Sequence, residues 1–147
     1  MSLPLADSAL VLGIDHVGVA VPDLDAAIAW YRDVLGLEVT HRETNTEQGV
    51  EEAMVSAGNA QVQLLAPLDE TSTIAKFLSR SGPGLQQLAY RVTDVEAVSQ
   101  QLRDKGLRLL YDAPRRGTAG SRVNFVHPKD AGGVMVELVE PAATPAH

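Results

Sequence analysis

An internal repeat constrains the fold of this chain more than any other feature. Residues 13–26 align with residues 84–97 at a constant offset, with glycine, valine, acidic and alanine positions coinciding. Residues 58–67 align with residues 132–141 after the offset has grown by three residues. Agreement at both ends, in the same order, is improbable by chance. Because two copies are too few for a solenoid, we predict two related modules that share one fold.

Each half of the repeat predicts the element order β-α-β-β-β. Amphipathic helices over residues 24–35 and 95–105 each follow an aspartate that can cap the first turn, and each is stopped by a glycine. A short helix over residues 72–81 joins the halves through a glycine- and proline-containing hinge. The predicted strands lie near residues 12–21, 36–44, 50–57 and 60–66, and then 84–92, 107–112, 121–127 and 133–140.

Two βαβββ modules predict an α+β fold in which adjacent sheets curl into one open, barrel-like cup with helices outside. We expect a single domain over residues 1–147, with module one at about 12–67, the linker helix at about 72–82 and module two at about 84–141. Alternate residues of each strand would reach the interior of such a cup.

The repeat also aligns four polar residues that lie among apolar strand residues. His16 aligns with Gln87, and Gln63 aligns with Glu137. A polar strand residue between apolar neighbours points to the opposite face from them. Any one of the four could simply face solvent. Two related pairs, however, place four nitrogen and oxygen ligands around one pseudo-twofold axis, and we therefore predict a divalent metal site.

Composition excludes several classes of function. The chain has no cysteine, which excludes disulfides, thiolate metal sites and a cysteine nucleophile. Its net charge of −7 argues against a nucleic-acid partner. No apolar stretch is long enough to span a bilayer, and residues 1–11 lack the basic region of a signal peptide, so we expect a cytoplasmic protein without a membrane partner.

The pattern resembles the vicinal oxygen chelate superfamily and, within it, the family of methylmalonyl-CoA epimerases. The resemblance extends over residues 12 to 140, almost the whole chain. The segments that carry it are 14–17, 23–25, 47–50, 62–68, 72–78, 110–112, 116–118, 124–129 and 133–138.

This resemblance implies a ligand set and a cofactor. The family's metal ligands are His, Gln, His and Glu, and they fall on His16, Gln63, Gln87 and Glu137. The cofactor would be a divalent ion such as Co, Mn, Ni or Zn. Gln87 departs from the usual histidine, and an amide is a weaker ligand than imidazole for borderline ions. Three consequences stay open: weaker metal binding, preference for a harder ion such as Mn, or a Gln87 that acts through water.

The resemblance also implies a reaction. Members of the family interconvert (R)- and (S)-methylmalonyl-CoA by 1,1-proton transfer through a metal-stabilised enolate. Their catalytic glutamates fall on Glu52 and Glu137. Glu51 is the alternative base, and strand alternation puts it on the opposite face from Glu52.

The expected partners are an acyl-CoA substrate and, because an open cup leaves strand edges, a second copy in a homodimer. Five basic residues are candidates to bind the coenzyme A phosphates or the substrate carboxylate, since basic side chains suit anion contacts. They are Lys76, Arg115, Arg116, Arg122 and Lys129.

Two alternatives share the predicted fold. A glyoxalase-type isomerase applies the same enolate chemistry to a glutathione thiohemiacetal but usually presents two glutamate ligands. A metal-free module that binds small molecules is the second, and the Gln87 departure keeps it open. An extradiol dioxygenase is disfavoured because it needs two histidines, and only His16 is available at these positions.

Overall fold

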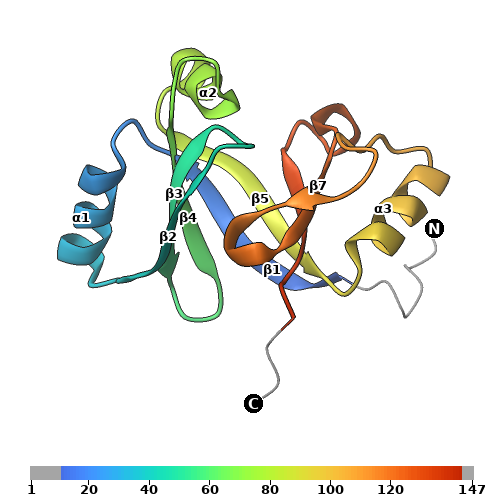
Figure 1. The fold of residues 1–147 in the computed structure, drawn as a ribbon, viewed down its shortest axis with the longest axis horizontal. Coiled ribbons are helices and arrows are strands. Elements are labelled where there is room, and N and C mark those ends of the chain that lie inside the picture. The colour runs from blue at the N-terminus through green and yellow to red at the C-terminus, as the bar shows by residue number, and fades with distance from the viewer. Residues whose placement is uncertain (1–10, 144–147) are drawn as a thin grey trace. The chain divides into compact units, whose positions relative to one another are not determined.

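A computed structural model describes residues 11–143, which divide into two compact units (Figure 1). Among the described residues, one unit is formed by residues 16–87 and the other by residues 11–15 and 88–143. The boundaries fall inside strands β1 (Val11–Ala20) and β5 (Gly84–Val92). The expectation that residues 1–10 contain no signal peptide concerns a segment outside the described residues.

The unit of residues 16–87 has the predicted βαβββ order. It contains helix α1 (Leu24–Leu35), strands β2 (Val39–Asn45), β3 (Val50–Ser56) and β4 (Gln61–Pro67), and helix α2 (Thr73–Ser81). The strand order is β2-β3-β4-β1, with β1 parallel to β4 and the other pairs antiparallel. The predicted helix over 24–35 is confirmed, because Asp23 accepts from the Ala26 N–H at 3.1 Å and Gly36 adopts a left-handed conformation.

The two faces of this sheet differ in character. Helix α1 packs along one face, over an apolar cluster that includes Leu24, Val55 and Leu64 (Figure 1). On the opposite face, α2 packs over Ala20 and Leu65. In β1, β3 and β4, the residues of the apolar cluster under α1 alternate along the strand with polar residues. Because strand side chains alternate between faces, these polar residues lie on the face that α2 packs against.

The second unit repeats this arrangement. Helix α3 (Val95–Asp104) is followed by strands β6 (Arg115–Arg116), β7 (Arg122–Val126) and β8 (Val136–Glu140), with the short 3-10 helices η1 (Thr118–Gly120) and η2 (Pro128–Asp130) between them. The strand order is β5-β8-β7-β6, with β5 parallel to β8. One face packs against α3 through Val126 and Leu138, and the other face carries Ala89, Val123, Phe125 and Val139.

The register of the parallel strands reproduces the alignment of the repeat. In one unit Gly18 of β1 lies opposite Gln63 of β4. In the other, Ala89 of β5 lies opposite Glu137 of β8. Gln63 and Glu137 therefore occupy equivalent positions in their units, as the repeat predicts.

The strand predicted over residues 107–112 is wrong. This segment forms only a single bridge, between Leu109 and Val126, and the strand that pairs with β7 is instead the two-residue β6. The buried side chain of Asn124 explains the irregularity. Its Oδ1 accepts from the Tyr111 N–H at 3.1 Å and its Nδ2 donates to the Tyr111 carbonyl at 3.0 Å, so a side chain replaces the backbone ladder there.

Two other strands begin later than the sequence predicts. The strand expected from residue 133 begins at Val136, because Gly132 and Gly133 form a turn with positive φ angles. The strand expected from residue 36 begins at Val39, after the left-handed Gly36. Within residues 11–143, every helix is too short or too polar to cross a membrane.

We expect Asn124→Ala to lower the free energy of unfolding by about 2 kcal/mol, because it removes both side-chain hydrogen bonds to the Tyr111 backbone and leaves the partly buried Tyr111 N–H without its partner. Urea denaturation followed by circular dichroism measures this change. Asn45→Ala is the control, since Asn45 accepts a single bond, from the half-buried Gln48 N–H, and its loss should cost less than about 1 kcal/mol. Equal losses for the two variants would contradict the role given to Asn124.

Candidate active site

Four polar side chains form a hydrogen-bonded chain in the unit of residues 16–87, on the sheet face opposite α1. Gln63 Nε2 donates to Glu52 Oε2 at 3.0 Å. Gln87 Nε2 donates to Gln63 Oε1 at 3.1 Å and lies 3.4 Å from His16 Nε2. The chain therefore runs from His16 through Gln87 and Gln63 to Glu52, and joins three of the four predicted metal ligands to one predicted catalytic glutamate.

Burial distinguishes Glu52 from its neighbour. Glu52 is 2% exposed, and a carboxylate removed from water to this extent requires hydrogen-bond partners such as Gln63. Glu51 instead pairs with Arg42 at 2.7 Å, and Arg42 also binds Asp25 of α1. Glu51 thus lies on the α1 side of the sheet and its side chain is 39% exposed, whereas Glu52 lies with His16 and Gln63.

Gly18 makes room for Gln87 in this arrangement. A Cβ atom built on Gly18 would lie 2.4 Å from Cγ and 3.0 Å from Cδ of Gln87. Any larger residue at position 18 would therefore displace Gln87 from His16 and Gln63. Sequence reasoning did not single out Gly18, although a glycine inside a predicted strand is a known sign of close approach by another group.

Glu137 belongs to the other unit and lies on β8. It is 6% exposed and lies opposite Phe125 on one neighbouring strand and Ala89 on the other. Strand alternation puts it on the face that carries Val139 and away from α3. Its position is thus the counterpart of Gln63, with a carboxylate in place of an amide.

The donor set of the first unit fits a hard divalent ion. Within residues 11–143, no three His, Asp or Glu side chains lie close enough together to hold a metal, so a site here must use amide oxygens. His16 Nε2 and Gln63 Oε1 converge on one atom, Nε2 of Gln87. Rotating the Gln87 amide by a half-turn exchanges this nitrogen for Oε1, which would complete a set of one imidazole nitrogen and two amide oxygens.

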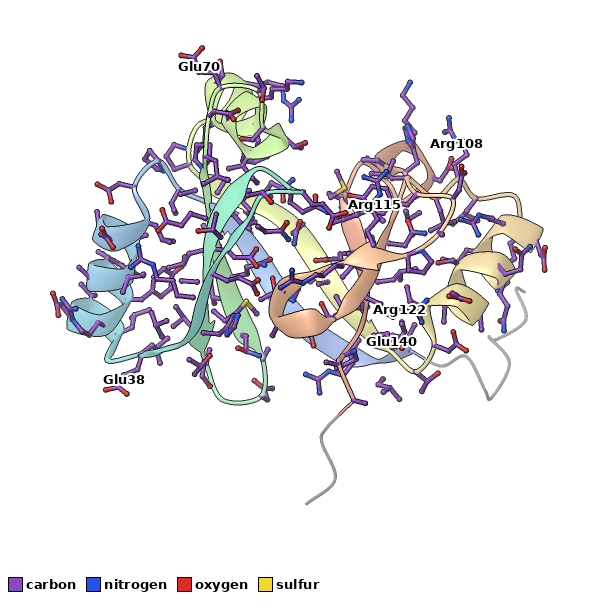
Figure 2. The ribbon with its side chains drawn as sticks, in the orientation of Figure 1. Glu38, Glu70, Arg108, Arg115, Arg122 and Glu140 are labelled. Carbon is purple, nitrogen blue, oxygen red and sulfur yellow. The ribbon has the colours of Figure 1, made fainter. Side chains whose placement is uncertain are left out.

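The five predicted substrate-binding cations have different surroundings. Arg122 is ion-paired with Glu96 and lies 3.7 Å from Glu140 (Figure 2), and the hydrogen bond to Glu96 raises the pKa of its guanidinium. The Arg115 guanidinium lies 4.0 Å above the ring of Tyr111. The other three lie on separate elements, Lys76 on α2, Arg116 on β6 and Lys129 on η2.

Comparison with known proteins identifies the class to which this fold and site belong. The profile of the Glyoxalase/Bleomycin resistance protein/Dioxygenase superfamily matches residues 15–125. The chain therefore belongs to that superfamily, and the predicted vicinal oxygen chelate fold is confirmed.

Closer relatives narrow the class. The structure of methylmalonyl-CoA epimerase from Mycobacterium tuberculosis is 60% identical, covers 95% of this chain and 93% of its own, and superimposes with a TM-score of 0.89. A methylmalonyl-CoA epimerase in complex with methylmalonyl-CoA and NH4+ is 46% identical, with coverage of 94% and 100% and a TM-score of 0.88. The ethylmalonyl-CoA/methylmalonyl-CoA epimerase of Cereibacter sphaeroides is 40% identical over 85% of this chain and 95% of its own length. Within the superfamily, the chain belongs to the methylmalonyl-CoA epimerase family, which confirms the predicted enzyme class.

A mutant cycle tests the contact between Gly18 and Gln87. We expect Gly18→Ala to lower the free energy of unfolding by about 1–3 kcal/mol, as overpacking in a filled interior does. In a Gln87→Ala background the same substitution should cost much less, because the clashing side chain is gone. Urea denaturation of the four proteins measures the coupling, and additive effects would contradict the contact.

Proposed function

We propose that this chain interconverts (R)- and (S)-methylmalonyl-CoA by 1,1-proton transfer. The observation that carries the proposal is the buried carboxylate of Glu52, held by Gln63 in one hydrogen-bonded chain with Gln87 and His16. Relatives at 40–60% identity that bear the name of this activity give it further support.

The reaction requires two groups that exchange protons with one carbon. The hydrogen between a thioester and a carboxylate is weakly acidic, and removing it leaves a planar carbanion equivalent. Inversion follows only if one group removes the proton from one face and another returns a proton to the opposite face. We assign these two roles to Glu52 and Glu137, the buried carboxylates on the sheet faces opposite α1 and α3 in their respective units.

His16, Gln63, Gln87 and Glu137 would hold a divalent ion. When bound, such an ion supplies positive charge to the substrate oxygens on which negative charge develops. In this scheme Gln63 has two tasks, because its Oε1 serves the ion while its Nε2 keeps one carboxylate oxygen of Glu52 in position. Gln87 in place of a histidine favours a hard ion such as Mn over Zn.

We also propose that the chain acts as a homodimer. Val11, Leu12 and Ile14 at the start of β1 are about half exposed, and apolar side chains gathered in this way favour association. Light scattering coupled to size exclusion tests the assembly, and a monomer at micromolar concentration would contradict it.

The test of the function starts from (S)-methylmalonyl-CoA in D2O with protein loaded with Mn. The proposal expects deuterium to enter at the carbon between the two carbonyl groups, as followed by mass spectrometry, while chiral analysis finds both epimers. Absence of both changes at micromolar protein would contradict the function. Exchange without epimerisation would contradict the assignment of two opposed proton-transfer groups.

Glu52→Gln should lower the rate of epimerisation, measured by chiral analysis, by about 10²–10⁴-fold, because the amide can neither accept nor return the proton on its face of the carbon. Glu51→Gln is the matched control, since it makes the same chemical change on the α1 side of the same strand and should leave the rate within about twofold, as surface changes remote from a site do. A reversed pattern, with Glu51→Gln inactive and Glu52→Gln active, would transfer the role to Glu51.

Removal of metal should abolish activity and lower thermal stability together. We expect dialysis against a chelator to reduce incorporation to background, and Mn at about 100 times its dissociation constant to restore it and stabilise the fold by about 2.7 kcal/mol. Calorimetric melting temperatures measure the second effect. Full activity in chelated, metal-free protein would contradict the proposed ion.

A further inference from the structure

We propose that Arg115 binds the acyl carboxylate of the substrate and thereby selects malonyl-type thioesters over simple acyl thioesters. This inference rests on the proposed function, since it concerns the substrate named there. All the residues that support it belong to the unit of residues 11–15 and 88–143, so it depends on the geometry of that unit alone.

The register of β6 puts Arg115 and Arg116 on opposite faces of the sheet. Arg115 lies opposite Val123, whose side chain belongs to the cluster on the face away from α3. Arg116 lies opposite Arg122, which pairs with Glu96 of α3 itself. Because paired residues share a face, Arg115 lies on the face of Glu137, and Arg122 on the face covered by α3.

A rigid aromatic platform holds the Arg115 guanidinium. It lies 4.0 Å above the ring of Tyr111, the distance of a cation–π contact. The backbone of Tyr111 is fixed by its two hydrogen bonds with the Asn124 side chain, one donated and one accepted, and by a 2.8 Å bond that Arg103 donates to its carbonyl. The Tyr111 ring in turn meets the ring of Phe125 edge-on, with centroids 5.8 Å apart. The irregular segment after residue 107 therefore serves to place this cation.

The charge of Arg115 is not neutralised by a neighbouring carboxylate in the part of the chain that the structure describes. Arg91 and Arg108 of the same unit are paired with Asp15 and Asp130, at 2.9 Å in both cases. For Arg115 the described contact is the ring of Tyr111. Stacking uses the flat face of the guanidinium and leaves its N–H edge available for an anion, and a carboxylate matches that edge in bidentate geometry.

The position relative to Glu137 favours the acyl carboxylate over a phosphate of coenzyme A. Phe125, against which the platform packs, lies directly opposite Glu137. Strands β6 and β8 flank β7, two strand spacings or about 10 Å apart, so Arg115 and Glu137 lie on one face on either side of Val123 and Phe125. In the substrate the carboxylate is bonded to the reacting carbon, whereas the phosphates lie at the far end of the pantetheine arm. A cation on the same face as a proton-transfer group is thus placed to meet the carboxylate rather than the distant phosphates.

The test compares three ligands by isothermal titration calorimetry with the full chain: methylmalonyl-CoA, propionyl-CoA, which lacks only the carboxylate, and coenzyme A. We expect Arg115→Gln to weaken methylmalonyl-CoA binding on the order of 10-fold or more, as for loss of a charge-assisted contact, and to leave the other two within about twofold. Arg80→Gln is the matched control, because Arg80 also lies over an aromatic ring, that of Phe77, and its loss should change no affinity.

Variants of the platform provide a second measurement. Tyr111→Leu removes the ring and should weaken methylmalonyl-CoA binding about threefold, whereas Tyr111→Phe keeps the ring and should not. Circular dichroism melting verifies that the variants are folded, and Arg115→Lys, which keeps the charge without the planar fork, should recover part of the affinity.

Each outcome separates the inference from the proposed function. Equal weakening of all three ligands by Arg115→Gln would assign Arg115 to a phosphate and overturn the carboxylate role. No change for any ligand, with a wild type that binds methylmalonyl-CoA, would overturn the role of Arg115 alone. A wild-type chain that binds none of the three would overturn the proposed function and the role of Arg115 with it.

Discussion

The parallel pairing of the first and last strands in each unit is the constraint on which the rest of the structure depends. Gly18 opposite Gln63 and Ala89 opposite Glu137 are the same register, repeated. A shift of one residue in either pair would turn the polar side chain toward the helix-covered face and an apolar one away from it. The apolar clusters under α1 and α3 resist such a shift, so packing on one face holds the polar groups on the other.

The two units carry different chemical groups at equivalent positions of their parallel strand pairs. Gly18 leaves a space that Gln87 fills, and this brings the Gln87 amide to His16 and Gln63. The Gln63 amide then contacts both groups of the site, because its Oε1 accepts from Gln87 and its Nε2 donates to the carboxylate of Glu52. In the second unit the equivalent residue is itself a carboxylate, Glu137. The repeat thus provides two equivalent positions, one occupied by an amide and the other by a carboxylate.

Much of this arrangement could be predicted from sequence because it depends on periodicity. The repeat predicted the βαβββ order, and strand alternation alone assigned Glu52 and Glu51 to opposite faces of the sheet.

Features that depend on a single long-range contact could not be predicted. Asn124 replaces the backbone ladder at Tyr111, and nothing local marks it as more than one residue of a strand. The order of the hydrogen bonds among Gln87, Gln63 and Glu52 depends likewise on side-chain geometry. Glu52 itself has no acidic counterpart in the second half, where the equivalent position is Val123, so the resemblance to the family and not the repeat identified it.

The proposed function requires that His16, Gln63, Gln87 and Glu137 hold one divalent ion. A crystal structure with Mn and a non-reactive analogue of methylmalonyl-CoA, with anomalous diffraction recorded for the metal, tests this claim most directly. We expect a single strong anomalous peak in contact with all four side chains, with the Gln87 amide turned to present its oxygen. A peak bound elsewhere, or a bound analogue with no metal and with the Gln87 nitrogen still on Gln63, would contradict it.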